Sequence, residues 1–290
     1  MRTSLLLLAV VALAVTACGG GDDEVTPPAP VETPGETTET QPSPTETDEG
    51  AEELALRVYF VRDERVGVAG RRVERTQAVA QAALRELLEG PDDADRQAGL
   101  SSSIPTGTEL RGIAIADGVA TVDLSRRFES GGGSLSMQLR VAQVVYTLTQ
   151  FPTVERVAFR IDGRDVDAIG GEGVTVAPSV GRADFEDVTP QILVESPVPG
   201  ETVTSPLRVT GTANTFEATF FLQVNQGGRN LADRFFTATS GSGERGTFDA
   251  TVEFQLDADG AGTGTLVAYE RSAEDGSSVN VVSIPVRFRR

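Results

Sequence analysis

Cys18 is the residue of this chain whose surroundings point most directly to a chemical modification. It is the only cysteine among 290 residues and directly follows Val15-Thr16-Ala17. Upstream, Arg2 supplies a positive start and residues 4–15 form an apolar run, too short for the roughly 20 residues that span a bilayer. This order is typical of a signal peptide that ends in a lipobox. The sequence predicts that residues 1–17 are removed and that Cys18 carries acyl chains, palmitate among them, that anchor the protein to a membrane.

Several aspartates lie close enough in sequence to suggest a cation site. Asp162, Asp165 and Asp167 form one such group, and Asp257-Ala258-Asp259-Gly260 forms another. A calcium loop requires the pattern D-x-D-x-D-G followed by a bidentate glutamate, and neither group has it. Aspartates are common in turns for other reasons, because they tolerate turn backbones and hydrogen-bond to them. We therefore expect turn and surface aspartates here, and no metal site.

The residue types that the chain lacks exclude several classes of enzyme. With no histidine and one cysteine, it cannot form a Ser/His/Asp triad, a Cys/His dyad or a His-ligated zinc site. Glycoside hydrolysis needs only two carboxylates, but the sequence does not pair any two of them. Gly131-Gly132-Gly133 does not lie in a strand-to-helix turn of the G-x-G-x-x-G kind. The sequence thus predicts no catalytic residue, no cofactor and no enzyme activity.

Residues 18–53 have the composition of a linker. They are rich in Pro, Thr, Glu, Gly and Asp and contain almost no large apolar side chain. Such a segment cannot bury enough surface to fold, and its prolines and like charges favour extension. We expect a disordered acidic spacer that holds the folded part away from the membrane.

Residues 54–188 have the pattern of a first folded domain. Strands are expected at 54–61, 66–73, 110–116, 119–124 and 154–161, where apolar and polar residues alternate. Asp117-Gly118 favours a type I′ hairpin, because both positions tolerate positive φ. Thr76 and Ser134 are expected to cap two amphipathic helices, which end at Gly90-Pro91 and Phe151-Pro152. This order predicts an α+β two-layer domain with helices on one face of a sheet.

Four motifs of this domain resemble, in order and spacing, the GerMN domain of sporulation and germination lipoproteins. They are Leu87-Leu88-Glu89-Gly90-Pro91, Ser103-Ile104-Pro105-Thr106-Gly107-Thr108, residues 117–125 and Tyr146-Thr147-Leu148-Thr149-Gln150-Phe151-Pro152. The resemblance implies an assembly or interaction module and supplies no catalytic residue. Each motif also suits a structural role as a helix stop or a turn.

Residues 189–290 have the pattern of an all-β sandwich of immunoglobulin type. Short alternating strands are expected at 192–195, 207–212, 218–225, 234–238, 247–254, 265–270 and 279–288. With no tryptophan and no cysteine here, the core must be packed with Phe, Leu and Val. The segment from Ser196-Pro197 to Ala218 resembles the immunoglobulin-like domain of bacterial spore germination. Glu217 is the acidic residue within this motif that we single out as a candidate binding residue.

These features together predict a non-enzymatic lipoprotein at the extracytoplasmic face of the cell membrane. Its domains are expected to mediate protein assembly, either with themselves or with an envelope protein partner, in a role that the family resemblance links to sporulation or germination. Two alternatives are an accessory or sensor subunit of an envelope signalling system and a protein that binds cell-wall glycan, with peptidoglycan as partner. The net charge of −18 argues against nucleic acid, because a phosphate backbone is bound by clustered cations.

Overall fold

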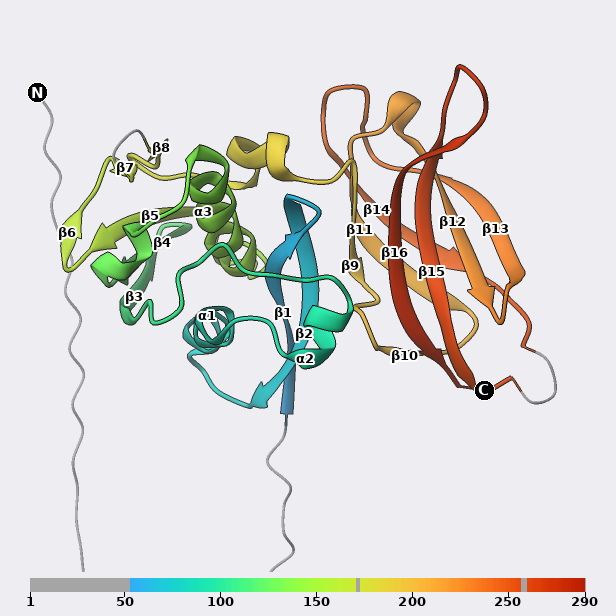
Figure 1. The fold of residues 1–290 in the computed structure, drawn as a ribbon, viewed down its shortest axis with the longest axis horizontal. Helices are drawn as coiled ribbons and strands as arrows, with labels where there is room; N and C mark the ends of the chain where they lie inside the picture. Colours follow the sequence, from blue (N-terminus) through green and yellow to red (C-terminus); the bar gives the residue numbers. More distant parts are fainter. Residues whose placement is uncertain (1–52, 171–172, 257–259, 290) are drawn as a thin grey trace, which may run out of the picture. The chain divides into compact units, whose positions relative to one another are not determined.

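The computed structural model describes residues 53–170, 173–256 and 260–289 (Figure 1). The predicted signal peptide, Cys18 and all of the predicted linker before Glu53 lie outside these residues, and so does the pair Asp257 and Asp259. Within the described ranges, no helix combines the length and the hydropathy that a membrane span requires.

The first domain mixes helices and strands, as the sequence predicts. Its strands are β1 (Glu53–Arg62), β2 (Arg65–Glu74), β3 (Leu110–Ala116), β4 (Val119–Leu124), β5 (Arg156–Ile161), β6 (Arg164–Asp165), β7 (Ala168–Ile169) and β8 (Val174–Thr175). Its helices are α1 (Val79–Glu89), α2 (Asp93–Gln97) and α3 (Ser134–Leu148), and its 3-10 turns are η1 (Arg126–Glu129) and η2 (Arg182–Val188). The predicted hairpin is confirmed, because β3 and β4 pair across Asp117 and Gly118, whose φ angles are 50° and 77°.

The strands of this domain are divided between separate sheets instead of forming the single sheet that the sequence suggests. β1 and β2 form a two-stranded hairpin, and β3, β4, β5 and β6 form a second sheet in that order. α1 and α3 contact strands of both sheets, β1 among them (Figure 1). Alternation identifies a strand but not its neighbour, so the α+β fold class is confirmed while its sheet pairing could not be deduced.

Both helices begin without the predicted side-chain caps. α1 starts at Val79, and Thr76 instead accepts a hydrogen bond from the backbone N–H of Ala78, 3.1 Å away. This local turn uses the threonine hydroxyl before the helix begins. α3 has Gly133 at its N-cap position, so Ser134 is already its first helical residue.

The second domain is a sandwich of two sheets. Its strands are β9 (Ile192–Ser196), β10 (Thr202–Val203), β11 (Leu207–Ala213), β12 (Thr219–Gln226), β13 (Arg229–Thr237), β14 (Gly246–Val252), β15 (Gly262–Arg271) and β16 (Ser278–Phe288), with a 3-10 turn η3 (Phe216–Ala218). One sheet has the order β10-β16-β15-β12-β13 and the other β14-β11-β9. The Phe220 and Phe248 rings lie 4.5 Å apart in a core of Phe, Leu, Val, Ile and Ala side chains, as expected. β13 begins five residues earlier than predicted, because Gly227 and Gly228, both at positive φ, close a tight hairpin with β12.

β9 belongs to the cores of both domains. Ile192 and Val194 pack in the sandwich core, whereas Leu193, between them, packs in the core of the first domain. Successive side chains of a strand point to opposite faces, so both faces of this strand are covered. The continuous apolar run at its start is therefore the sequence signature of a shared element.

Candidate functional site at the domain junction

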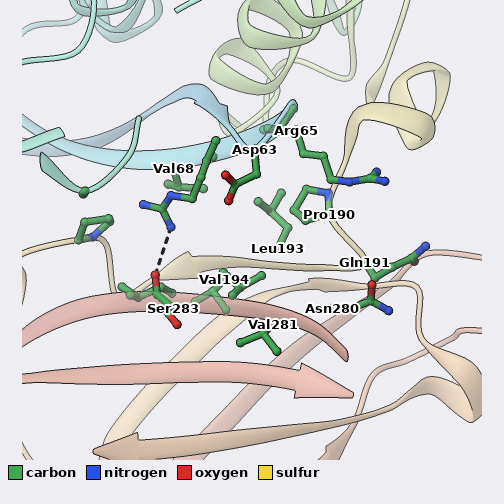
Figure 2. A pocket seen from close by; sticks show the side chains of 17 residues that line it. Asp63, Arg65, Val68, Pro190, Gln191, Leu193, Val194, Asn280, Val281 and Ser283 are labelled. Atoms are coloured by element: carbon green, nitrogen blue, oxygen red, sulfur yellow. Dashed lines mark hydrogen bonds between the residues drawn. The ribbon is translucent and has the colours of Figure 1, made fainter. Parts of the chain in front are cut away.

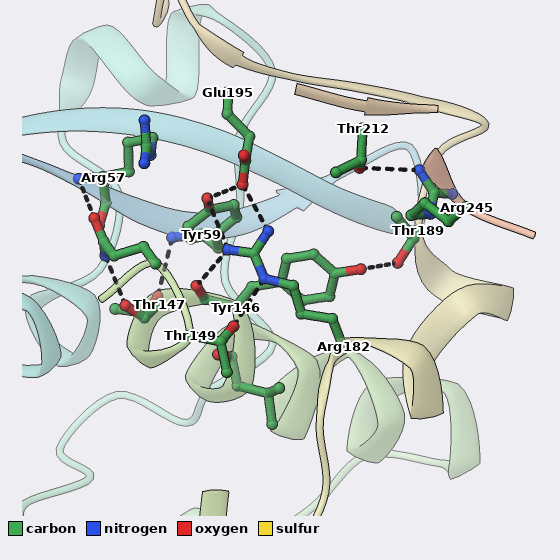
Figure 3. A network of polar contacts seen from close by, with 12 residues as sticks. Arg57, Tyr59, Tyr146, Thr147, Thr149, Arg182, Thr189, Glu195, Thr212 and Arg245 are labelled. Atoms are coloured by element: carbon green, nitrogen blue, oxygen red, sulfur yellow. Dashed lines mark hydrogen bonds and ion pairs between the residues drawn. The ribbon is translucent and has the colours of Figure 1, made fainter. Parts of the chain in front are cut away.

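Three polar side chains, one buried and two partly buried, join the first domain to the second. We call them the junction triad: Tyr59 on β1, Arg182 at the start of η2, and Glu195 on β9 (Figure 3). The Tyr59 hydroxyl donates a very short hydrogen bond to the Glu195 carboxylate. The Arg182 guanidinium forms an ion pair with the same carboxylate, with 2.7 Å between Nη1 and Oε1. One carboxylate of the sandwich thus binds two groups of the first domain.

The remaining nitrogens of Arg182 are also hydrogen-bonded. Nε donates to the Thr149 hydroxyl at 2.8 Å, and Nη2 donates to the Tyr59 hydroxyl at 3.2 Å and to the Tyr146 carbonyl at 3.3 Å. The guanidinium also lies over two aromatic rings, 4.6 Å from the centre of Tyr146 and 5.3 Å from that of Tyr59. All three nitrogens of Arg182 thus have hydrogen-bond partners within the protein, which suits a structural connection.

Burial and pairing shift the pKa values of this triad. Burial raises the pKa of the Tyr59 phenol well above its usual value, so the hydroxyl stays protonated and donates. Burial also opposes the charge on Glu195, but Arg182 and the Tyr59 hydrogen bond outweigh it and lower the pKa of that carboxyl. The ion pair is therefore intact at neutral pH.

A second ion pair joins the domains beside the first. Arg245, which precedes β14, binds the Glu186 carboxylate of η2 in a bidentate manner at 2.8 Å and 2.9 Å. Its guanidinium also donates to the Pro190 carbonyl at 2.9 Å, and the Asn214 amide donates to Glu186 at 2.8 Å. These hydrogen bonds hold the pKa of Glu186 below its usual value against the opposing effect of burial. The 3-10 turn η2 is thus attached to the sandwich at two points, Arg182 and Glu186.

A pocket of about 510 Å³ also lies between the domains (Figure 2). Its walls come from the β1–β2 turn and the start of β2, from the residues around β9, and from the first half of β16. Its polar lining side chains are Arg62, Asp63, Arg65, Gln191, Asn280 and Ser283, and its apolar lining includes Val66, Val68, Leu193, Val194, Val281 and Ile284. Pockets of this volume at a domain interface are a common location for small-ligand sites.

Arg62 is the unusual side chain of this pocket. Its Nη1 donates to the Ser283 carbonyl at 3.2 Å, but its Nε and Nη2 are buried without a hydrogen-bond partner. Burial lowers the pKa of this guanidinium. A desolvated cation with unused donors costs free energy, so this side chain requires an explanation.

The structure does not gather the aspartates of the first domain into a cation site. Asp162 pairs with Arg111 at 2.9 Å, and Asp165 pairs with Arg160 at 2.6 Å. Among the residues that the structure describes, no three His, Cys, Asp or Glu side chains are grouped as metal ligands. Asp162 has positive φ in the turn that it shares with Gly163, in keeping with the turn role expected for it.

Glu217 lies on the exposed turn η3 and is not part of the junction triad. Its φ is 52° and that of Ala218 is 57°, and its backbone N–H donates to the Ser242 hydroxyl at 2.9 Å. Phe216, before it, is 67% exposed. The binding role of Glu217, like the lipidation of Cys18, stays a prediction.

The sequence did not indicate the junction residues. Arg182, Glu186, Glu195 and Arg245 belong to no motif, and each resembles a surface charge when read alone. The signal that could have suggested a junction is the unbroken apolar run Ile192-Leu193-Val194, because a one-sided sandwich strand would alternate.

Comparison with known proteins identifies both domains. Residues 57–167 match the Germane model, "Sporulation and spore germination", and residues 191–277 match Gmad2, "Immunoglobulin-like domain of bacterial spore germination". The spore germination protein GerM of Bacillus subtilis (strain 168) is 24% identical over 192 residues, which are 65% of this chain and 51% of GerM. The chain therefore spans about half the length of this curated relative.

Two solved structures from Bacillus subtilis are also similar. The tandem GerMN domains of GerM share 17% identity at a TM-score of 0.42, over 72% of this chain and 64% of that one. The first GerMN domain of GerM alone shares 22% identity at a TM-score of 0.38, over 45% of this chain and 98% of that one. The chain thus carries a segment that matches the Germane domain, followed by a segment that matches the immunoglobulin-like Gmad2 domain.

Proposed function

We propose that the protein is a membrane-anchored, non-enzymatic envelope lipoprotein whose two domains act together as one assembly module, in a role related to spore germination. The observation that carries this proposal is the buried junction, in which the triad and the Glu186–Arg245 pair fasten the domains to each other. A partner then meets a composite surface in which the two domains are held in one relative orientation. The name of the similar GerM protein supports the germination-related part.

The signal-peptide pattern supports the location. A mature N-terminus at Cys18 with its acyl chains would place the module at the extracytoplasmic face of the membrane, beyond an acidic spacer. The partner would be a second copy or another envelope protein, since the acidic chain does not suit nucleic acid.

In-cell crosslinking of the full-length protein, followed by mass spectrometry of the recovered partners, tests this proposal. We expect the anchored protein to capture itself or a defined envelope protein, and Cys18→Ala to lose that capture. Recovery of peptidoglycan fragments alone would instead favour the wall-binding alternative. Recovery of a sensor kinase would favour the accessory role in signalling.

The junction supplies a second test in the same cells. Glu186→Gln weakens one interdomain ion pair while the junction triad remains, so the anchored protein should capture less partner. Asp249→Asn is the matched control, because its exposed pair with Arg208 lies within the sandwich. Equal capture by both variants would contradict a requirement for a fixed junction.

A further inference from the structure

We propose that the pocket between the β1–β2 turn, β9 and β16 binds a small monoanionic ligand through its carboxylate, with Arg62 as the anion-binding residue. This site goes beyond the assembly role and does not depend on it. Nothing in the anchoring or partner capture described above requires the pocket to be occupied.

The first step of the argument is the unused side of the Arg62 guanidinium. Nε and Nη2 are the two donors that form the lateral fork of an arginine, and both are buried without a partner. That fork matches the two oxygens of a carboxylate in a bidentate arrangement. Among the described residues, only Arg62 has two such nitrogens buried and unpaired, and it also lines a pocket.

The second step concerns access to these donors. Both donors are covered, and Nη1 of Arg62 is held by a single hydrogen bond of 3.2 Å to the Ser283 carbonyl. An arginine side chain has several rotatable bonds, so release of this contact lets the fork turn toward the cavity that the side chain lines. The ligand then replaces one weak contact with two charge-assisted hydrogen bonds, which recovers the cost of the unpaired donors.

The charge of the lining sets the charge of the ligand. Arg62 and Arg65 contribute two cations and Asp63 one anion, so the pocket has a net charge of about +1 within a chain of −18. Arg65 is fixed at the rim by hydrogen bonds to the Asp187 and Thr189 carbonyls, at 3.0 Å and 3.2 Å. A single carboxylate balances this charge, whereas a phosphate dianion would meet repulsion from Asp63.

The walls indicate the body of the ligand. Val66, Val68, Leu193 and Ile284 are buried apolar residues of the lining, and Figure 2 shows Val68, Leu193 and Val194 beside the polar groups. An apolar body of a few carbons would cover the exposed part of the apolar lining, which includes Val281, 51% exposed. A free carboxylic acid and the C-terminal end of a peptide share this chemistry.

Calorimetric titration of the full-length protein in nonionic detergent tests the site. The probes are N-acetylleucine, its uncharged methylamide, the tripeptide Gly-Gly-Leu with a free or an amidated C-terminus, and inorganic phosphate. We expect N-acetylleucine to bind and its methylamide not to bind. Tighter binding of the free tripeptide assigns the site to peptide ends, and tighter binding of N-acetylleucine assigns it to small acids.

Two variants and one control connect the binding to this pocket. Arg62→Gln removes the charged fork and should weaken binding about tenfold or more. Ser283→Trp should reduce binding by filling the cavity while Arg62 stays intact, so the test survives if Arg62→Gln fails to fold. Arg72→Gln is the control, because Arg72 is an exposed arginine of the same hairpin outside the pocket, and it should bind as the wild type does.

Three results would overturn the proposal. One is no binding of any carboxylate probe at about 10 mM, above the Kd of weak specific ligands. Another is phosphate binding as tightly as N-acetylleucine, which would reveal an unspecific anion site. The third is equal weakening by Arg62→Gln and Arg72→Gln. Each of these leaves the assembly proposal untouched, because partner capture is measured separately.

Discussion

The junction between the domains contains two arginines with opposite surroundings. Each nitrogen of Arg182 is hydrogen-bonded, and its guanidinium rests on two tyrosine rings. Arg62, at the end of β1, leaves Nε and Nη2 buried and unpaired beside a cavity. Both side chains come from the first domain and face the second. The difference separates a structural connection, where every guanidinium nitrogen has a partner, from a candidate ligand site, where two nitrogens have none.

The largest expected effect is the loss of the Arg182 side chain. Arg182→Met leaves the Glu195 carboxylate in a site where it is only 15% exposed and has lost its cation. Breaking such a pair costs about 3 kcal/mol of unfolding free energy, at the lower end of the range for buried pairs because Arg182 is partly exposed. Urea unfolding followed by circular dichroism measures this loss.

Arg208→Met is the matched control for this substitution. Arg208 also forms a bidentate pair, with Asp249, but both side chains are exposed, at 72% and 56%. Exposed pairs contribute little, so this variant should unfold close to the wild type. A loss as large as that of Arg182→Met would mean that the burial of the junction triad does not matter.

A smaller loss of unfolding free energy is expected at Gly70, where the backbone of the first domain closely approaches the Val198 side chain of the second. A Cβ added at Gly70 on β2 would lie 2.6 Å from Cγ2 of Val198 in the second domain, well inside van der Waals contact. Gly70→Ala should therefore cost about 1–3 kcal/mol through overpacking. The double variant Gly70→Ala with Val198→Ala should recover most of that loss in the same urea experiment. Failure to recover would place the strain elsewhere.

How much of the fold can be predicted from the sequence depends on how far apart in the sequence the interacting residues lie. The hairpin at Asp117-Gly118 and the alternating strand β11, whose burial alternates through Leu207–Ala213, follow from neighbouring residues alone. β1 pairs with β2 alone, and α1 starts at Val79. Both features depend on contacts with residues outside the local sequence. Fold class and the β3–β4 hairpin were thus predictable, and the division of the strands between separate sheets was not.

The candidate site was still less accessible to sequence reasoning. Arg182 and Glu195 are 13 residues apart and belong to different domains, and neither has a pattern that separates it from a surface charge. Arg62 stands at the end of an alternating strand, where a charged residue is ordinary. Their roles come from what surrounds them in three dimensions. A sequence motif reports such roles only when local spacing enforces them.

Acidification should gradually weaken the ion pair between Glu195 and Arg182 that connects the two domains. The folded-state pKa of Glu195 lies below its unfolded value of about 4.3, so its contribution to stability is complete above that value. It is lost as pH falls through the folded pKa, because the protonated carboxyl no longer pairs with Arg182. Urea midpoints between pH 3 and pH 7 should therefore show the difference between wild type and Glu195→Gln shrinking toward low pH. A constant difference would indicate that Glu195 contributes by packing alone.

The smallest change in unfolding free energy should come from substitution of Arg62, and the sign of that change is informative. Arg62→Met keeps the length of the side chain and removes a cation whose Nε and Nη2 make no hydrogen bond, at the loss of one 3.2 Å contact to Ser283. Removing an unpaired buried charge is neutral or stabilising, so the unfolding free energy should stay within about 1 kcal/mol of the wild type or exceed it. The same substitution type at Arg182 is expected to cost several times more. Urea unfolding could instead show that Arg62→Met is as destabilised as Arg182→Met. Arg62 would then be a structural arginine that has hydrogen-bond partners in solution, and its donors would no longer support an anion site in the pocket.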